Sequence, residues 1–232
     1  MAEQLALDVG LREGMSFASF LVGDNAAAVE TVRLLGTAGG ERQVCLWGGA
    51  ESGKTHLLHA ACAEAAAQGL RASYLPLDTL AAHGPALLEG LEQLDLVCLD
   101  DVQEVAGDEA WERALFDCIN RLRAGHTRLL LAARQAPAGL DIRLPDLASR
   151  LVWGPVFQLH TLDDAQKCAA LGLRAGLRGF ELPREVCEHL LRTHARNLSY
   201  LMSVLERLDA ASLAAQRRIT LPFLRQILSG ED

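Results

Sequence analysis

The chain has 232 residues, which is enough for one large domain or for a medium domain followed by a small one. Half of the residues are hydrophobic, so a sizeable core is available and a globally disordered chain is excluded. The formal net charge of −8 argues against a large basic surface for nucleic acid, and no apolar run is long enough to span a membrane.

The cysteines and the first residues bear on the cellular compartment. Six cysteines are scattered without a C-x-x-C pair, and most fall in apolar periodic segments, so we expect buried free thiols in a reducing cytosol. The first residues do not join a basic region to an apolar stretch, so we expect no secretory signal and a cytoplasmic protein.

Residues 1–15 are expected to form a tail. Within it the sequence QLALDV, from Gln4 to Val9, places apolar side chains at alternate positions after a glutamine. One interpretation is a frayed terminus that packs on the domain, and the other is a linear motif that docks into a partner's groove. The spacing alone favours the frayed terminus.

From residue 16 to residue 159, apolar strands alternate with helices. This pattern predicts a parallel, buried β-sheet with helices on both faces. Asp24 or Asn25 is expected to cap the first helix. We expect helices over 26–35, 55–67, 78–94 (interrupted near residue 84) and 109–124, and strands over 44–47, 71–77, 95–100, 128–133 and 156–159.

The segment between the first strand and the second helix reads GGAESGKT and fits the phosphate-binding pattern G-x-x-x-x-G-K-[ST] at every fixed position. Glycines let the backbone wrap round a phosphate, while successive N–H groups and the helix N-terminus supply positive potential. A glycine-rich turn that binds nothing is the alternative, which the flanking strand and helix disfavour. We expect a lysine on the β- and γ-phosphates, a threonine hydroxyl on Mg²⁺, and a nucleotide site formed by Gly48, Gly49, Ala50, Glu51, Ser52, Gly53, Lys54 and Thr55.

A second acidic feature follows about 45 residues after the loop, where the apolar strand LVCL ends in Asp100 and Asp101. In folds with this loop, such a strand is expected to run beside the loop strand and to deliver a carboxylate to the metal. Asp100 is the candidate on the Mg²⁺ side, through water, and Asp101 is the candidate that orients or deprotonates an attacking water. The alternative is an acidic turn with no part in chemistry.

Arg150 lies on the predicted short helix PDLASRL, before the last strand. An arginine at the edge of a domain can reach the γ-phosphate held by a neighbouring subunit, as an arginine finger does. Position alone favours the plainer alternative of a surface arginine in a salt bridge.

The pattern changes after residue 159. Helices are expected over 162–176, 183–193, 197–216 and 221–229, with no strand between them. We therefore expect three parts: a tail over 1–15, an α/β nucleotide-binding domain over 16–159, and a small all-helical domain over 160–232.

Together these features resemble the AAA+ ATPase core of the DnaA family of bacterial replication initiators. The resemblance covers THLLHA after the loop lysine, FLVGDN from residue 20 and DDVQ from residue 100. Later stretches, including LPDLASRL, RGFELP and AAQRRITLPF, are most similar to the Hda-type regulators of the same family, nearly end to end. The resemblance implies a P-loop AAA+ fold with a helical lid, and adds Leu21, Val22 and His56 to the nucleotide contacts.

The resemblance also implies partners. Hda-type members bind ADP or ATP with Mg²⁺, dock on the β sliding clamp, reach DNA indirectly through that clamp, and promote hydrolysis of the ATP bound to DnaA. It implies that Arg150 is the arginine finger, which reverses the interpretation from position alone. The family has proline and leucine where this chain has Asp8 and Val9, but the anchors are present, so we expect clamp binding through Gln4, Leu5, Leu7 and Val9.

Two departures from the family concern the γ-phosphate. Ala133 stands where relatives have a polar sensor residue, and Ser199 stands where they have a lid arginine. Arg196 lies one helical turn before Ser199 and is expected to reach the nucleotide instead. We expect nucleotide binding with little intrinsic hydrolysis. An AAA+ adaptor or loader that acts on DNA or a helicase, without stimulating DnaA, is the alternative, and a homodimer or higher oligomer stays open.

Overall fold

The computed structural model describes residues 14–35, 37, 39–193 and 196–228. The predicted clamp motif, Gln4 to Val9, lies outside these described residues. The chain divides into two compact units, Met1–His160 and Thr161–Asp232. Sequence reasoning placed the division after residue 159.

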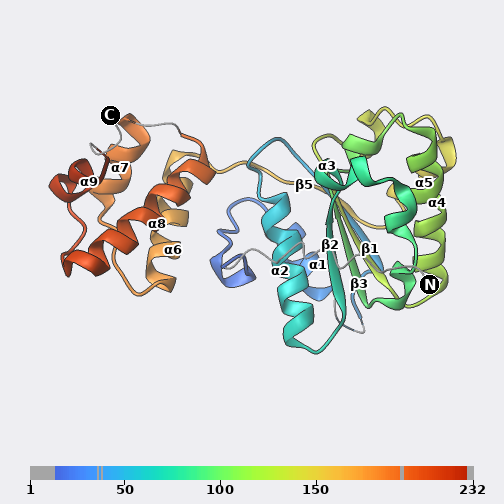
Figure 1. The fold of residues 1–232 in the computed structure, drawn as a ribbon, viewed down its shortest axis with the longest axis horizontal. Helices are drawn as coiled ribbons and strands as arrows, with labels where there is room; N and C mark the ends of the chain where they lie inside the picture. Colours follow the sequence, from blue (N-terminus) through green and yellow to red (C-terminus); the bar gives the residue numbers. More distant parts are fainter. Residues whose placement is uncertain (1–13, 36, 38, 194–195, 229–232) are drawn as a thin grey trace. The chain divides into compact units, whose positions relative to one another are not determined.

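The first unit contains a five-stranded sheet with the order β2-β3-β4-β1-β5, in which all paired strands are parallel (Figure 1). The predicted parallel sheet is confirmed. One expectation was wrong, because β3 does not run beside the loop strand β1. Instead β4 lies between them and pairs with both, because an alternation of strands and helices in the sequence does not determine which strands become neighbours. The strands are β1 Gln43–Trp47, β2 Ala72–Pro76, β3 Leu96–Asp100, β4 Arg128–Ala133 and β5 Val156–Gln158.

Both faces of the sheet are buried, because neighbouring side chains of each strand enter two different core clusters. Val97 and Leu99 pack with α4 and α5, whereas Val44 and Cys98 pack with α1 and α2 on the opposite face (Figure 1). This arrangement explains why the strands are apolar almost throughout, and it confirms helices on both faces. The helices are α1 Ala26–Leu34, α2 Lys54–Ala67, α3 Leu77–Leu80, α4 Glu109–Ala124 and α5 Pro145–Leu151.

The segment after β2 is not the helix that its apolar spacing predicts. Only the four residues of α3 are α-helical, and three 3₁₀ turns follow, at Ala81–His83, Pro85–Leu88 and Leu91–Gln93. Gly84 (φ 83°) and Gly90 (φ 78°) have positive φ angles, which an α-helix does not contain. The apolar residues of the segment are nevertheless buried in the core shared with α4.

The second unit is all-helical within its described residues. Its helices, α6 Asp164–Leu177, α7 Arg184–Thr193, α8 Leu198–Ala215 and α9 Leu221–Leu228, surround one apolar cluster. In the described parts of both units, no helix is both long enough and apolar enough to cross a membrane.

The expectation of six free thiols was wrong for the second unit, where Cys168 and Cys187 form a disulfide between α6 and α7. Their Cα atoms are 5.7 Å apart, a usual separation for a disulfide. Two helices that pack together create this proximity, and a spacing of 19 residues in the sequence does not reveal it. The other four cysteines are free and buried, and burial raises the pKa of Cys45 to about 12 and of Cys118 to about 11.

Candidate nucleotide-binding site

The phosphate-loop segment connects β1 to α2 and is held at the end of the sheet. The Gly48 N–H donates to the carbonyl oxygen of Ala133 on β4 (3.2 Å). A Cβ at Gly48 would lie 2.6 Å from the Leu159 carbonyl oxygen. At Gly53, where φ is +91°, a Cβ would lie 2.6 Å from a ring carbon of Phe20. Two of the glycines that the motif prescribes are therefore required by the packing of this chain.

Lys54 is buried inside the curl of the loop. Its Nζ donates to the carbonyl oxygens of Gly48 (2.7 Å) and Gly49 (2.8 Å), and it lies 3.3 Å from Ser52 Oγ. Burial lowers the pKa of the Lys54 ammonium, and the nearby Asp100 carboxylate opposes that shift. The loop thus concentrates one cation and the start of a helix at one point, which is the chemistry that recognises a phosphate.

Thr55 and Asp100 meet across the sheet although β1 and β3 are not neighbours. The Thr55 hydroxyl donates to Asp100 Oδ2 (2.7 Å), and the Tyr74 hydroxyl, from β2, donates to the same oxygen (3.0 Å). Burial raises the pKa of the Asp100 carboxyl, and the hydrogen bond from Thr55 opposes the rise. The pKa of Tyr74 is also raised, by burial first and then by Asp100, so the phenol keeps its proton and acts as a donor.

These groups fit Mg²⁺ in the manner of a nucleotide-assisted site. Among the described residues there is no cluster of three or more His, Cys, Asp or Glu side chains that would hold a metal. Mg²⁺ is usually bound by one or two protein oxygens together with phosphate oxygens and water. The Thr55 hydroxyl donates its hydrogen to Asp100, and its oxygen lone pairs would be available to the ion, so Asp100 would orient this ligand without contacting the metal itself.

Asp101 has a left-handed backbone (φ 53°), which is uncommon for a residue with a side chain. Its N–H donates to Asp100 Oδ1 (3.0 Å). Its own Oδ1 accepts from Gln103 Nε2 (2.6 Å) and lies 3.6 Å from Arg134 Nε. The two predicted carboxylates thus follow one another, but they face different partners.

The segment before α1 packs on the loop helix. His56 Nε2 lies 3.0 Å from the Ser16 carbonyl oxygen, and the Phe20 ring meets the His56 ring edge-on, with centroids 5.2 Å apart. Leu21 and Val22 are half-buried directly after Phe20. The sequence predicts nucleotide contacts at Leu21 and Val22 but not at the adjacent Phe20. The contact between the Phe20 ring and Gly53 joins distant parts of the chain, and no sequence pattern predicts it.

Asn25 occupies the N-cap position of α1, as expected, but its side chain makes no capping hydrogen bond. Its amide pairs with the backbone of His160 instead: Nδ2 donates to the carbonyl oxygen (3.1 Å) and Oδ1 accepts from the N–H (2.8 Å). The side chain therefore joins two segments 135 residues apart, at the end of the first unit.

Arg150 is half-buried on α5 and is held by aromatic rings. Its guanidinium carbon lies 3.8 Å from the centre of the Trp153 ring and 5.3 Å from that of Phe116, and its Nε donates to Asn120 Oδ1 (3.1 Å). Within the described part of the chain, no carboxylate lies at ion-pair distance from it, so the salt bridge considered from position alone is not what holds it. The charge is oriented but not neutralised.

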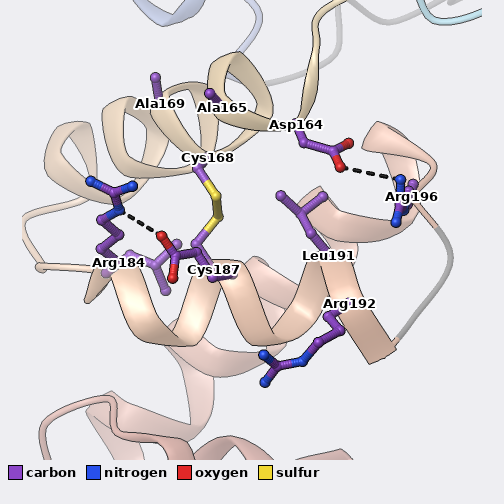
Figure 2. A pocket seen from close by; sticks show the side chains of 11 residues that line it. Asp164, Ala165, Cys168, Ala169, Arg184, Cys187, Leu191, Arg192 and Arg196 are labelled. Carbon is purple, nitrogen blue, oxygen red and sulfur yellow. Dashed lines mark hydrogen bonds and ion pairs between the residues drawn. A yellow bond between two sulfur atoms is a disulfide. The ribbon is translucent and has the colours of Figure 1, made fainter.

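Arg196 belongs to the second unit, where it borders a pocket of about 520 Å³ between α6 and α7 (Figure 2). Its Nη1 pairs with Asp164 Oδ2 (3.2 Å) at one end of the pocket, and Arg184 pairs with Glu188 (2.6 Å) elsewhere on the rim. The Cys168–Cys187 disulfide lies in the wall between these pairs (Figure 2). The expected approach of Arg196 to a nucleotide stays a prediction.

Comparison with known proteins places this geometry in a family. The family model "Bacterial DnaA ATPAse domain" matches residues 11–158, and the model "Hda, lid domain" matches residues 164–228. Domain III of the Thermotoga maritima replication initiation protein DnaA is similar over 95% of this chain and 98% of its own, with a TM-score of 0.77 and 21% identity.

Two further solved structures are similar. AMPPCP-bound DnaA from Aquifex aeolicus is 28% identical with a TM-score of 0.71, and a replication initiator DnaA bound to AMPPCP and single-stranded DNA is 27% identical with a TM-score of 0.71. In both cases 84% of this chain is covered, and it spans 65% of the length of the relative. Because the ATPase-domain model covers well over half of the sequence and is followed by the Hda lid, the chain belongs to the DnaA family of AAA+ proteins, as an Hda-like member.

Proposed function

We propose that this protein is a negative regulator of replication initiation, which binds ADP or ATP with Mg²⁺ and stimulates hydrolysis of the ATP bound to DnaA. The observation that carries the proposal is Arg150, whose charge has no carboxylate partner among the described residues and is held in one orientation by Trp153, Phe116 and Asn120.

The nucleotide has the structural role in this proposal. The phosphate loop is complete, and Lys54, which donates to two loop carbonyls here, would bind the β-phosphate of the nucleotide. Thr55, oriented by Asp100, would be the protein group that holds Mg²⁺, and the ion would supply positive charge to neutralise the phosphates. The Ala133 methyl group is buried in the core and has no hydrogen-bonding atom for a γ-phosphate. The protein therefore holds ADP, or hydrolyses ATP slowly, and the bound nucleotide sets its conformation.

Arg150 acts on the nucleotide of another molecule. A guanidinium placed against the γ-phosphate of DnaA-bound ATP stabilises the negative charge of the transition state, and such an arginine supplied in trans contributes about 10³–10⁵ in rate. Asn120 and the Trp153 ring fix the direction of the guanidinium before the partner arrives, so less conformational freedom is lost on docking.

The tail brings the protein to its substrate. The anchors Gln4, Leu5 and Leu7 dock on the β sliding clamp as an extended peptide. DNA is contacted through the clamp, which agrees with the net charge of −8 on this chain. The complex acts in the cytoplasm.

The test is hydrolysis of ATP bound to DnaA, in the presence of DNA-loaded clamp. Arg150→Ala is expected to lower the stimulated rate by about 10³-fold or more while leaving ADP binding to this chain unchanged. Arg123→Ala is the matched control, because the Arg123 guanidinium stacks on the same Trp153 ring (4.0 Å). Undiminished stimulation by the Arg150 variant, or an equal loss in the Arg123 variant, would refute the assignment.

Direct DNA binding is the second candidate, because one similar DnaA structure contains single-stranded DNA. An adaptor or loader of this kind binds an oligonucleotide without clamp and does not change DnaA hydrolysis. Fluorescence anisotropy with a labelled single strand, with and without clamp, distinguishes the two functions.

A further inference from the structure

Arg134 directly follows β4 and faces the acidic turn after β3. Its Nε lies 3.6 Å from Asp101 Oδ1, and its Nη2 lies 3.5 Å from Glu104 Oε1. Slightly more than half of the Arg134 side chain is exposed (58%). Exposed ion pairs of this kind contribute little to stability.

Gln103 completes the arrangement from the other side. Its Nε2 donates to Asp101 Oδ1 (2.6 Å), while its Oε1 accepts from the backbone N–H of Arg134 (2.9 Å). One oxygen of Asp101 thus faces an amide donor and a guanidinium at the same time. The amide also ties the acidic turn to the residue that carries the guanidinium, so the three groups form one unit.

This unit lies at the phosphate end of the site. Burial is the main cause that lowers the pKa of the Lys54 ammonium; Asp100 and Asp101 oppose the shift, and the nearby charge of Arg134 adds to it. In addition, Asp101 directly follows Asp100, which accepts a hydrogen bond from the Thr55 hydroxyl. Arg134 is therefore close to the groups that would surround the terminal phosphate of a bound nucleotide.

We propose that Arg134 is a positioning residue that, together with Gln103, engages the Asp101 carboxylate and keeps it from orienting water at bound ATP. This inference rests on the proposed nucleotide binding. It attributes the proposed slow hydrolysis of ATP to Arg134 and Gln103, in addition to the missing polar side chain at position 133. In hydrolysis, the water oxygen forms a bond to the γ-phosphorus, the bond to the β–γ bridging oxygen breaks, and the water proton passes to a base and then to phosphate. An Asp101 oxygen that already accepts from the Gln103 amide and faces the Arg134 guanidinium is held toward these two groups, and so is less available to accept a hydrogen bond from the attacking water.

The test uses the full chain and measures nucleotide binding separately from single-turnover hydrolysis of bound ATP. Arg134→Ala is expected to raise the hydrolysis rate about tenfold, a part of what a positioned base contributes, with ATP and ADP affinities within about twofold of the original chain. Arg134→Lys keeps the charge and is expected to hydrolyse slowly. Arg71→Ala is the matched control. Arg71 is similarly exposed and pairs with Asp95 (3.7 Å), but this pair precedes β2 and β3 and so lies at the opposite end of these strands from Asp101.

The effect must pass through Asp101. In the double variant Arg134→Ala with Asp101→Asn, the gain in rate is expected to disappear. The inference is overturned if Arg134→Ala leaves hydrolysis unchanged or slower, if the gain survives in the double variant, or if Arg134→Ala abolishes nucleotide binding, which would make Arg134 a ligand of the nucleotide. If the original chain binds neither ATP nor ADP, the proposed function fails as well, and this outcome is distinct from the other three.

Discussion

The carboxylate of Glu112 is buried in the first unit, where it has no cationic partner among the described residues and is surrounded by backbone N–H groups. It lies on α4 with 1% of its surface exposed. It accepts from the N–H groups of Gly107 (2.8 Å), Arg143 (3.0 Å) and Leu144 (2.8 Å). These donors belong to the turn before α4 and to the segment that leads into α5, so one side chain fixes the approach to the helix that carries Arg150.

Replacing Glu112 by alanine leaves three backbone N–H groups without their acceptor. A hydrogen bond to a charged group contributes about 1.5–3 kcal/mol, and a buried donor left without an acceptor costs about 1–3 kcal/mol, although the costs of neighbouring groups do not add fully. We expect the free energy of unfolding to fall by about 4 kcal/mol in Glu112→Ala. Glu112→Gln keeps one acceptor oxygen, and its cost is expected to be about half as large.

The assay is urea unfolding followed by tryptophan fluorescence. All three tryptophans, Trp47, Trp111 and Trp153, lie in the first unit and report on it alone. We expect a lower urea midpoint with an unchanged slope. Glu109→Ala is the control, because Glu109 lies one turn earlier on α4, is mostly exposed and pairs with Arg113, so its loss should cost no more than about 0.5 kcal/mol. A cost below about 1 kcal/mol for Glu112→Ala would refute the reasoning.

Three further predictions concern the loop, the acidic strand end and the lid. In Gly53→Ala, the alanine must adopt the left-handed backbone of the glycine, and its Cβ lies 2.6 Å from a ring carbon of Phe20, so ADP affinity should fall about tenfold in a fluorescence titration. Gly69 also has a positive φ but lies in open space, so the control variant Gly69→Ala should bind ADP normally. Burial raises the pKa of Asp100 in the folded state, so the folded state binds its proton more tightly, and the stability of the nucleotide-free chain should fall as pH rises above the ordinary pKa of an aspartate, about 3.9. Asp100→Asn should remove that fall, and equal pH profiles would contradict the assignment. Reduction of the Cys168–Cys187 disulfide, which joins residues 19 apart, should lower the stability of the lid by about 3 kcal/mol, measured by circular dichroism with and without reductant; an unchanged midpoint would exclude this.

The phosphate loop and most elements are predictable because their signals are local. Glycine at fixed positions and the period of apolar residues both act within one element, and α4 begins and ends where the pattern predicts, at Glu109 and Ala124. The segment after β2 defeats the same reasoning, because its leucines keep a helical spacing while Gly84 and Gly90 impose positive φ. There the backbone preference of two residues overrides the apolar period.

Contacts between distant residues are not predictable in this way. Tyr74 reaches Asp100 from the neighbouring strand, and Asn25 pairs with a backbone 135 residues away. Nothing in the sequence around Tyr74 or Asn25 indicates which distant residue its side chain will contact. Glu112 even has the sequence signature of an exposed helix position, and only the loops that close over it make it buried.

The order of the strands also changes the meaning of Ala133. From the sequence, the alanine marks a missing polar group at the γ-phosphate. In the structure β4 lies between β1 and β3, the Ala133 carbonyl accepts the first N–H of the loop, and the methyl group packs in the core with α4. The next residue, Arg134, therefore emerges between the loop and the acidic turn, where its guanidinium faces Asp101. The residue that follows this central strand lies at the phosphate end, so we expect the charge at position 134 to affect hydrolysis more directly than the methyl group at position 133.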